Sequence, residues 1–254
     1  MNTSSPNPPV ESDRTLNSTA IHAKSCQAHC RRIYASFSKK HTSNRLGKDH
    51  WFVSISLFAD PTELLSAVAF SGGVDSTCLL HLMHRMIRET KDPILRNLGL
   101  VAIHIDHAFR SESAQDAQHC QNWAESRSIP LVTRKVRWGE PPLPELKSLA
   151  HHKEEMARLA RMNLLFSVMK EKNASTILMA HHFDDQIETS VMRYRRLKDP
   201  DFTTGITPLG LAGMRPCRRW GMGLPSKNRL GFFGAEGMNH WVSRPLLDFP
   251  KVMG

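Results

Sequence analysis

The sequence has no apolar run long enough to cross a membrane, which takes about 18 to 20 consecutive apolar residues, so we expect no membrane-spanning segment. Cysteine is scarce and odd in number: the 254 residues include five, namely Cys26, Cys30, Cys78, Cys120 and Cys217. No two of them have the C-x-x-C spacing, which argues against a disulfide framework and a four-cysteine zinc site. These cysteines fit a reducing compartment best.

Acidic residues are missing between Arg14 and Lys48, where basic residues, Ser, Thr and Asn are frequent. A basic, acid-poor stretch of this kind is typical of a mitochondrial transit segment, although Glu11 and Asp13 precede it. The alternative is a disordered extension. We therefore expect residues 1–60 to be a leader and residues 61–254 to form the folded domain, with a mitochondrial location or else a cytoplasmic one.

Basic residues outnumber acidic ones, so the formal net charge is +10. This charge favours a polyanionic partner, with nucleic acid as the first candidate. The alternative is a basic leader attached to a neutral enzyme. Basic residues continue to the end of the chain, so both interpretations stay open.

From Leu64 onward, short apolar runs alternate with segments of helical periodicity, which predicts an α/β protein. We expect strands over 64–70, 98–105, 130–138, 176–182 and 241–247, and helices over 76–89, 111–128, 147–172 and 184–196. This alternation predicts an open parallel sheet with helices on both faces. Residues 197–240 contain many Gly, Pro and Arg residues and are expected to form long loops.

Helix starts are predicted from polar residues. Ser113 and Asp116 have the spacing of a capping box, and Asp184 is expected to cap the last helix. In that last helix, Ile187, Val191 and Tyr194 form an apolar face suited to the core.

The first expected strand leads into S-G-G-V-D-S at residues 71–76, a loop without the lysine of the G-x-x-x-x-G-K-[ST] phosphate loop. Gly72 and Gly73 let backbone amides approach an anion, and the helix amino terminus adds partial positive charge. Hydroxyl donors are expected from Ser71, Ser76 and Thr77. We predict an ATP site formed by Ser71, Gly72, Gly73, Val74, Asp75 and Ser76.

Asp75 is an unusual neighbour for a phosphate, because a carboxylate repels it. A Mg²⁺ ion held by Asp75 between the two anions removes this difficulty. The alternative is that Asp75 only caps its helix.

The loop S-G-G-V-D-S resembles the PP-loop of the N-type ATP pyrophosphatases, which implies a Rossmann-like fold. It also implies ATP cleavage between the α- and β-phosphates, adenylation of a substrate oxygen and release of pyrophosphate. Further motifs lie at residues 104–113, 153–166, 179–193, 210–216 and 243–251. With them, the chain from about residue 64 is similar to the tRNA(Ile)-lysidine synthetases. That family joins free L-lysine to the wobble cytidine of an isoleucine tRNA with a CAU anticodon, which implies ATP, Mg²⁺, lysine and tRNA as ligands.

Acids at the start of the last helix face the same crevice as the loop. Asp185 and Glu188 are neighbours on one helical face, so they suit a cation, either Mg²⁺ or the ammonium groups of lysine. The resemblance favours lysine, and it places His181 near the reacting centre. The predicted catalytic residues are Asp75, His181 and Asp185. Two alternatives stay open, a capping pair and a zinc site of His181, His182 and Asp185.

Arginines on the 147–172 helix match the family pattern E-x-x-A-R-x-x-R-Y, with Met162 in place of the tyrosine. Arg158 and Arg161 suit either ATP phosphates or an RNA backbone, and the alternative is a basic surface stripe. We expect Asp106 and Arg158 at the ATP site; the alternative for Asp106 is a carboxylate that stabilises its loop. Contacts with tRNA are expected from Arg161, Arg193 and Arg215.

Two departures from the family concern tRNA docking. The family continues into further tRNA-binding domains that we expect to be missing here, and residues 217–240 look inserted. Two other functions are therefore considered, a PP-loop tRNA sulfur transferase and a non-catalytic, truncated RNA-binding homologue. An oligomer is possible, and the sequence does not predict its state.

Overall fold

The computed structural model describes residues 65–91, 93–149, 153–197, 214–223 and 230–249. The expected leader, residues 1–60, lies outside these ranges, as does much of the expected loop region 197–240. The strands are β1 (Leu65–Ala69), β2 (Gly99–Asp106), β3 (Leu131–Lys135), β4 (Thr176–Leu178), β5 (Cys217–Arg219) and β6 (Trp241–Ser243). The α-helices are α3 (Val74–Glu89), α4 (Pro93–Arg96), α5 (Ser113–Glu125), α6 (Lys153–Glu171) and α7 (Phe183–Leu197), with short 3-10 helices at Leu146–Leu149 and Ala235–Met238.

The six strands form one sheet in the order β3-β2-β1-β4-β6-β5. All neighbouring pairs are parallel except β5 and β6, so the predicted open parallel sheet is confirmed, with one antiparallel edge strand. The order runs outward from β1 in both directions. This reversal places the carboxyl ends of β2, β1 and β4 side by side, and ligands of open α/β sheets bind at such a point.

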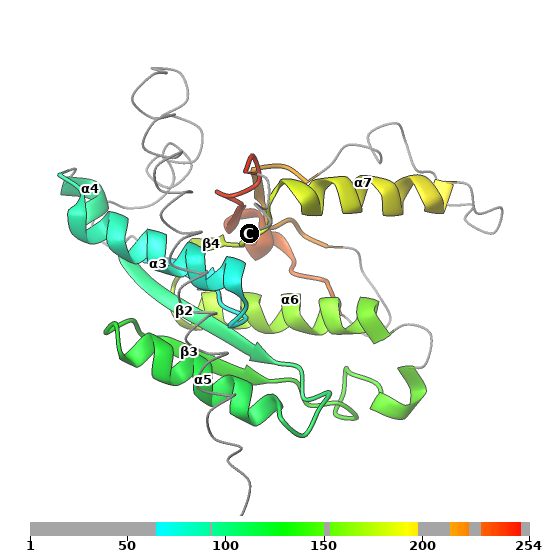
Figure 1. The fold of residues 1–254 in the computed structure, drawn as a ribbon. Coiled ribbons are helices and arrows are strands. Elements are labelled where there is room, and N and C mark those ends of the chain that lie inside the picture. The colour runs from blue at the N-terminus through cyan, green and yellow to red at the C-terminus, as the bar shows by residue number, and fades with distance from the viewer. Residues whose placement is uncertain (1–64, 92, 150–152, 198–213, 224–229, 250–254) are drawn as a thin grey trace, which may run out of the picture.

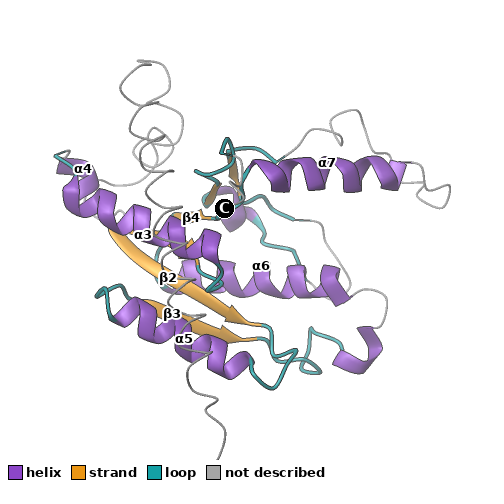
Figure 2. Ribbon diagram, in the orientation of Figure 1, coloured by secondary structure: helices purple, strands orange, loops and turns teal. Residues whose placement is uncertain are grey.

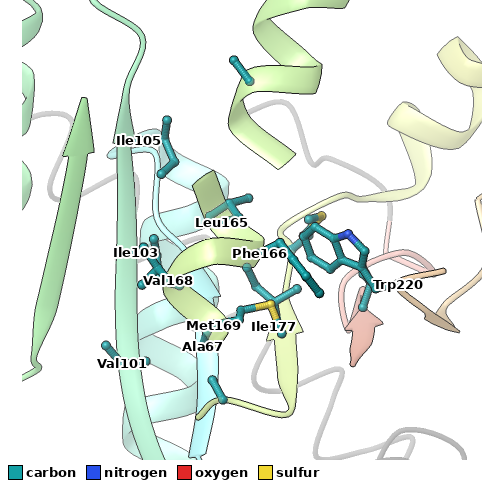
Figure 3. Packing of buried hydrophobic residues seen from close by; sticks show 14 of the residues in the cluster. Ala67, Val101, Ile103, Ile105, Leu165, Phe166, Val168, Met169, Ile177 and Trp220 are labelled. Atoms are coloured by element: carbon teal, nitrogen blue, oxygen red, sulfur yellow. The ribbon is translucent and has the colours of Figure 1, made fainter. Parts of the chain in front are cut away.

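Helices cover both faces of the sheet, as expected (Figures 1 and 2). On one face, α3 and α5 pack their buried Leu80, Met83 and Ala124 against alternate residues of β1 and β2. On the other face, Phe166 and Met169 of α6 pack against the sheet together with Trp220 (Figure 3). Met162, the departure from the family pattern, is partly buried against this second cluster.

Two of the predicted helix caps are wrong. The N-cap of α5 is Glu112, without a side-chain capping bond, and Ser113 is already the first helical residue. At the start of α7, the carboxylate that accepts a backbone N–H is that of Asp185, whose Oδ2 accepts from the N–H of His182 at 2.8 Å. Asp184 lies inside the first turn of the helix. Several polar residues adjoin each start, so their order alone does not decide which of them caps the helix.

The prediction that Ile187, Val191 and Tyr194 face the core is also wrong. Their exposed fractions are 52%, 44% and 52%. The physical reason is position: α7 follows the short β4 and extends away from the sheet (Figure 1), and no element in the described ranges covers this side. The expected helix 147–172 is α6 preceded by the 3-10 turn Leu146–Leu149. None of the helices described is long and apolar enough to span a membrane.

Candidate active site at the carboxyl ends of β2, β1 and β4

The loop that joins β1 to α3 has the form of an anion cradle. Gly73 is the N-cap of α3, and the first intrahelical bond runs from the N–H of Thr77 to the carbonyl of Gly73, at 3.0 Å. The amides of Val74, Asp75 and Ser76 precede this bond, so they have no acceptor within the helix. They point out of the helix amino terminus, where the helix dipole also favours an anion.

The hydroxyls of Ser76 and Thr77 form hydrogen bonds within the loop, and the predicted contacts of the loop with ATP stay predictions. The Oγ of Ser76 donates to the carbonyl of Gly73 at 3.0 Å and accepts the N–H of Ser71 at 3.2 Å. Thr77 Oγ1 donates to the same carbonyl at 2.9 Å. Each hydroxyl has one proton, so those of Ser76 and Thr77 brace the loop. Binding of an anion here falls mainly to the backbone amides.

Gly72 has a conformation that requires glycine. Its φ is +82°, and a Cβ added there would lie 2.7 Å from the Sγ of the buried Cys120. Gly73 differs on both counts, since its φ is −70° and the nearest atom to an added Cβ is 3.5 Å away. The two glycines therefore form a matched pair for mutation.

Gly72→Ala is expected to lower the free energy of unfolding by about 2 kcal/mol, because left-handed backbone and a crowded Cβ both cost energy. Gly73→Ala should change it by less than about 1 kcal/mol, because alanine is a poorer N-cap residue than glycine but also reduces the conformational freedom of the unfolded chain, and the two effects oppose each other. Urea unfolding followed by circular dichroism measures both. Equal destabilisation by the two substitutions would contradict this description of the loop.

A cavity of about 510 Å³ lies over the three strand ends. The loop after β1 contributes Ser71, Gly73, Asp75 and Ser76, and the segment after β4 contributes His181 and Asp185. The end of β2 and the residues that follow it contribute Asp106 and the turn to Arg110. Because β2, β1 and β4 are parallel neighbours, three segments distant in the sequence meet at one cavity.

His182 joins the loop to the acids of α7. Its Nε2 lies 3.7 Å from Asp75 Oδ2, and its Nδ1 lies 3.6 Å from Asp185 Oδ2 and 3.9 Å from Asp184 Oδ2. The side chain is only 12% exposed. From the sequence, His182 is expected only as a zinc ligand, and His181 is the histidine expected near the reacting centre. The sequence H-H-F-D-D at residues 181–185 indicates that a histidine lies near the acids, but it does not tell which of the two histidines faces them.

His181 is held by a buried arginine that is not among the site residues expected from the sequence. Arg244, 7% exposed, donates from Nε to His181 Nδ1 at 3.2 Å and from Nη1 to the carbonyl of Arg215 at 3.0 Å. Burial, and then the Arg244 charge, lowers the pKa of His181 to about 4. His181 is therefore neutral at pH 7, with its proton on Nε2 because Nδ1 accepts from Arg244. A histidine in this state donates a hydrogen bond rather than acting as a base.

Asp106 is buried and shapes the turn after β2. Its Oδ1 accepts the N–H of Ala108 at 2.7 Å, and Ala108 has a positive φ of 52°. One oxygen of Asp106 therefore stabilises its loop, as the alternative interpretation expects. The residue also lines the cavity, so its contact with ATP stays a prediction.

Two of the four predicted arginines line cavities. Arg161 lines the 510 Å³ cavity and also a second one, whereas Arg158 lines only the second. Arg215 is exposed and follows Met214, whose carbonyl accepts from Gln186 of α7 at 2.7 Å. Arg193 belongs to α7, and its side chain is outside the described part of the structure. Their roles toward ATP and tRNA stay predictions.

Glu188 is exposed on α7, one turn beyond Asp185, and it is not among the residues that line the cavity. Asp185 does line it. In the described ranges, no group of three or more His, Cys, Asp or Glu side chains is arranged to hold a metal ion. Mg²⁺ usually takes one or two carboxylates and completes its shell with water and substrate phosphates. Asp75 fits that smaller requirement, since its side chain is 26% exposed beside the loop amides.

The parallel sheet, the glycine loop and the cavity at the point of strand reversal define a nucleotide-binding α/β protein. Residues 53–253 match the family model described as "PP-loop domain", and the chain belongs to this family.

Similar curated proteins are tRNA(Ile)-lysidine synthases of bacteria. That of Enterococcus faecalis is 34% identical over 184 residues, which cover 72% of this chain and 31% of the relative. That of Bacillus subtilis is 32% identical over 157 residues, 61% of this chain and 29% of the relative. The chain thus spans about a third of the length of these relatives.

A solved structure with a similar fold is the U34-tRNA thiolase NcsA from Methanococcus maripaludis with its [4Fe-4S] cluster. The TM-score is 0.51 at 14% identity, covering 91% of this chain and 61% of that one. At this identity the likeness concerns the fold alone.

Proposed function

We propose that the chain ligates L-lysine to the wobble cytidine of an isoleucine tRNA with a CAU anticodon, at the expense of ATP. The observation that carries the proposal is the meeting of the PP-loop and the α7 acids at one cavity, with His182 between Asp75 and Asp185. Lysidine synthases among the relatives support the choice of substrate.

In the first proposed step, the carbonyl oxygen of the cytosine attacks the α-phosphorus of ATP, and pyrophosphate leaves. The amides of Val74, Asp75 and Ser76 bind the departing pyrophosphate. Asp75 would hold Mg²⁺, which when bound supplies positive charge beside the phosphates. Neutral His181 offers its Nε2–H to an oxygen that gains negative charge in this step.

In the second proposed step, the ε-amine of lysine attacks the adenylated ring carbon, and AMP leaves with the former carbonyl oxygen. Asp185 and Glu188 attract the lysine ammonium groups. The attacking amine must lose its proton, and a carboxylate such as Asp185 suits this better than His181, whose Nδ1 accepts from Arg244.

Glu188→Gln is expected to raise the KM for lysine about fivefold, which corresponds to roughly 1 kcal/mol for one exposed ion pair, with a smaller change in kcat. Glu125→Gln, an exposed acid on α5, is the matched control and should leave both constants unchanged. Steady-state kinetics with labelled lysine provides the measurement. An unchanged KM for lysine in the Glu188 variant would refute this role.

One assay separates the proposed function from its alternatives: the protein is incubated with ATP, labelled lysine and candidate tRNAs. Lysine incorporation supports the proposal. Adenylation of tRNA without dependence on lysine favours a sulfur transferase, and binding without turnover favours a non-catalytic homologue. Two of the three described cysteines are poorly suited to sulfur transfer, because Cys78 and Cys120 are buried and burial raises the pKa of Cys120 to about 11. The third, Cys217, is partly exposed, so the assay decides.

The mitochondrial location stays a prediction, because residues 1–60 lie outside the described ranges and the relatives come from bacteria. Intact-mass measurement of the protein purified from its cells would detect removal of these residues.

A further inference from the structure

A second cavity of about 390 Å³ adjoins the first and shares His107, Phe109 and Arg161 with it. Its remaining wall is the first two turns of α6, which contribute Lys153, Glu154, Ala157 and Arg158. The sequence predicts ATP or RNA contacts for Arg158 and Arg161, both of which line this cavity, but the two proposed chemical steps place no ligand in it. It combines two features, an aromatic wall and a basic wall.

The aromatic wall consists of His107 and Phe109, and Trp138, which does not line the cavity, stacks on Phe109 to complete a ladder of three nearly parallel rings. The centroids of His107 and Phe109 are 5.6 Å apart at an interplanar angle of 14°, and those of Phe109 and Trp138 are 5.4 Å apart at 17°. Each ring is only partly buried. Burial, and then Arg161, lowers the pKa of His107 below its ordinary value, which favours the neutral ring. His107 and Phe109 are the two rings of this ladder that reach the cavity.

Two hydrogen bonds hold the ladder in place before any ligand binds. Asp106 fixes the left-handed turn at Ala108, between the first two rings. Trp138 Nε1 donates to the carbonyl of His107 at 2.8 Å and so ties the third ring to the first. A surface built in this way loses little conformational entropy when a ligand stacks on it.

The basic wall has an excess of positive charge. Three of its residues are cationic, Lys153, Arg158 and Arg161, against one acid, Glu154. Lys153 Nζ lies 4.4 Å from the centre of the Phe109 ring. Neither Arg158 nor Arg161 forms an ion pair in the described part of the chain. Both guanidinium groups are therefore available to an external anion.

We propose that this second cavity binds single-stranded RNA, with a base stacked on the His107 and Phe109 rings that line it and neighbouring phosphates on Arg158 and Lys153. Stacking on aromatic rings beside a basic groove is the usual recognition of unpaired nucleotides. A duplex would not fit this role, since its bases are already stacked inside the helix. The choice of RNA as the ligand of this second cavity rests on the proposed function. The proposal adds to that function a binding place for nucleotides that lie outside the first cavity.

The test measures the binding of a fluorescently labelled single-stranded RNA of about eight nucleotides by anisotropy at several salt concentrations. Phe109→Leu is expected to raise its Kd about tenfold, the cost of one lost base stack, without changing the salt dependence. Arg158→Gln should raise the Kd and also reduce the slope of log K against log salt by about 0.7, the loss of one phosphate contact.

Two control variants remove an aromatic ring and a positive charge at positions outside the second cavity. Phe232→Leu replaces an exposed ring outside both cavities, and Arg96→Gln removes an exposed charge on α4. Both should leave the Kd and the slope unchanged, and the same RNA annealed to its complement should not respond to Phe109→Leu. Circular dichroism verifies that all variants are folded.

An unchanged Kd in Phe109→Leu, or an equal loss for duplex RNA, would overturn the assignment. The assay needs neither lysine nor turnover, so it separates this inference from the proposed function. If the protein binds RNA through Phe109 but transfers no lysine, the RNA-binding cavity is supported and the proposed ligation is refuted. If it transfers lysine while Phe109→Leu leaves the Kd unchanged, the ligation is supported and the RNA-binding cavity is refuted.

Discussion

Replacing Asp75 by asparagine is expected to reduce ATP cleavage by at least about 100-fold, with little change in stability. Asparagine keeps the size and hydrogen-bonding shape of the side chain and removes only its charge. Asp75 lies in the first turn of α3 and lines the cavity of about 510 Å³, 3.7 Å from His182, so the lost charge is the one suited to a cation beside the phosphates of a bound nucleotide. Formation of labelled AMP from ATP is the measurement, and chelation of Mg²⁺ should have the same effect on the unmutated protein.

The matched control is Glu89→Gln, an acid at the opposite end of the same helix, where it pairs with Arg85. This variant should cleave ATP at the original rate. If Asp75 served only to stabilise the start of α3, asparagine would replace it well, because asparagine is also a good residue at helix starts. Wild-type ATP cleavage by Asp75→Asn would therefore contradict the assigned role.

Replacing the buried Arg244 by methionine is expected to lower kcat/KM for lysine transfer about 10- to 100-fold and to raise the pKa of His181. The variant loses the donor to His181 Nδ1 and the positive charge that helps to lower this pKa to about 4. Because burial is the larger cause, the pKa should stay below the ordinary value of 6.5. A pH titration of the histidine resonances by NMR measures the shift.

Two control variants separate positioning from packing. Arg219→Met removes the same charge from the exposed end of β5 and should change neither quantity. Arg244→Lys keeps the charge without the planar fork, so kcat/KM should fall while the pKa of His181 stays near its original value. If Arg244 only fills space, methionine would preserve both the activity and the pKa, which is the contradicting result.

Stability should depend on pH through the same histidine. Between pH 4 and 6.5 the unfolded chain binds a proton at His181 that the folded protein does not bind. The free energy of unfolding therefore falls as the pH decreases through this range, by at most about 1.4 kcal/mol per unit from this residue. In Arg244→Met the pKa of folded His181 is higher, so the pH range over which only the unfolded chain binds this proton becomes narrower at its acidic end. Urea unfolding at several pH values should therefore show a smaller total decrease in the free energy of unfolding.

The layout of the sheet and the loop could be predicted because both have strong local signals. Apolar runs such as 98–105 predict buried strands, and paired glycines after a strand predict a phosphate loop. Because parallel strands end at the same edge of a sheet, the sequence also predicts that the 71–76 loop and the acids of α7 lie close together. The antiparallel strand β5 was missed, because its three residues, Cys-Arg-Arg, have no alternating pattern and are held by pairing with β6.

The finer details of the site depend on contacts that no local pattern encodes. Arg244 reaches His181 across 63 residues of sequence, and only the fold brings them together. Likewise, the protons of Ser76 and Thr77 are directed at Gly73 by loop geometry, although both hydroxyls are typical phosphate donors. The exposed face of α7 shows the converse: helical periodicity predicts an apolar face correctly but not whether another element covers it.

The most direct test of the central claim is nucleoside mass spectrometry of isoleucine tRNA after incubation with the protein, ATP and lysine, together with analysis of the nucleotide products. The predicted result is conversion of the wobble cytidine to its lysine adduct, with one AMP and one pyrophosphate formed for each lysine transferred. Formation of ADP instead of AMP, or AMP formation while the cytidine stays unmodified in the presence of lysine, would contradict the account.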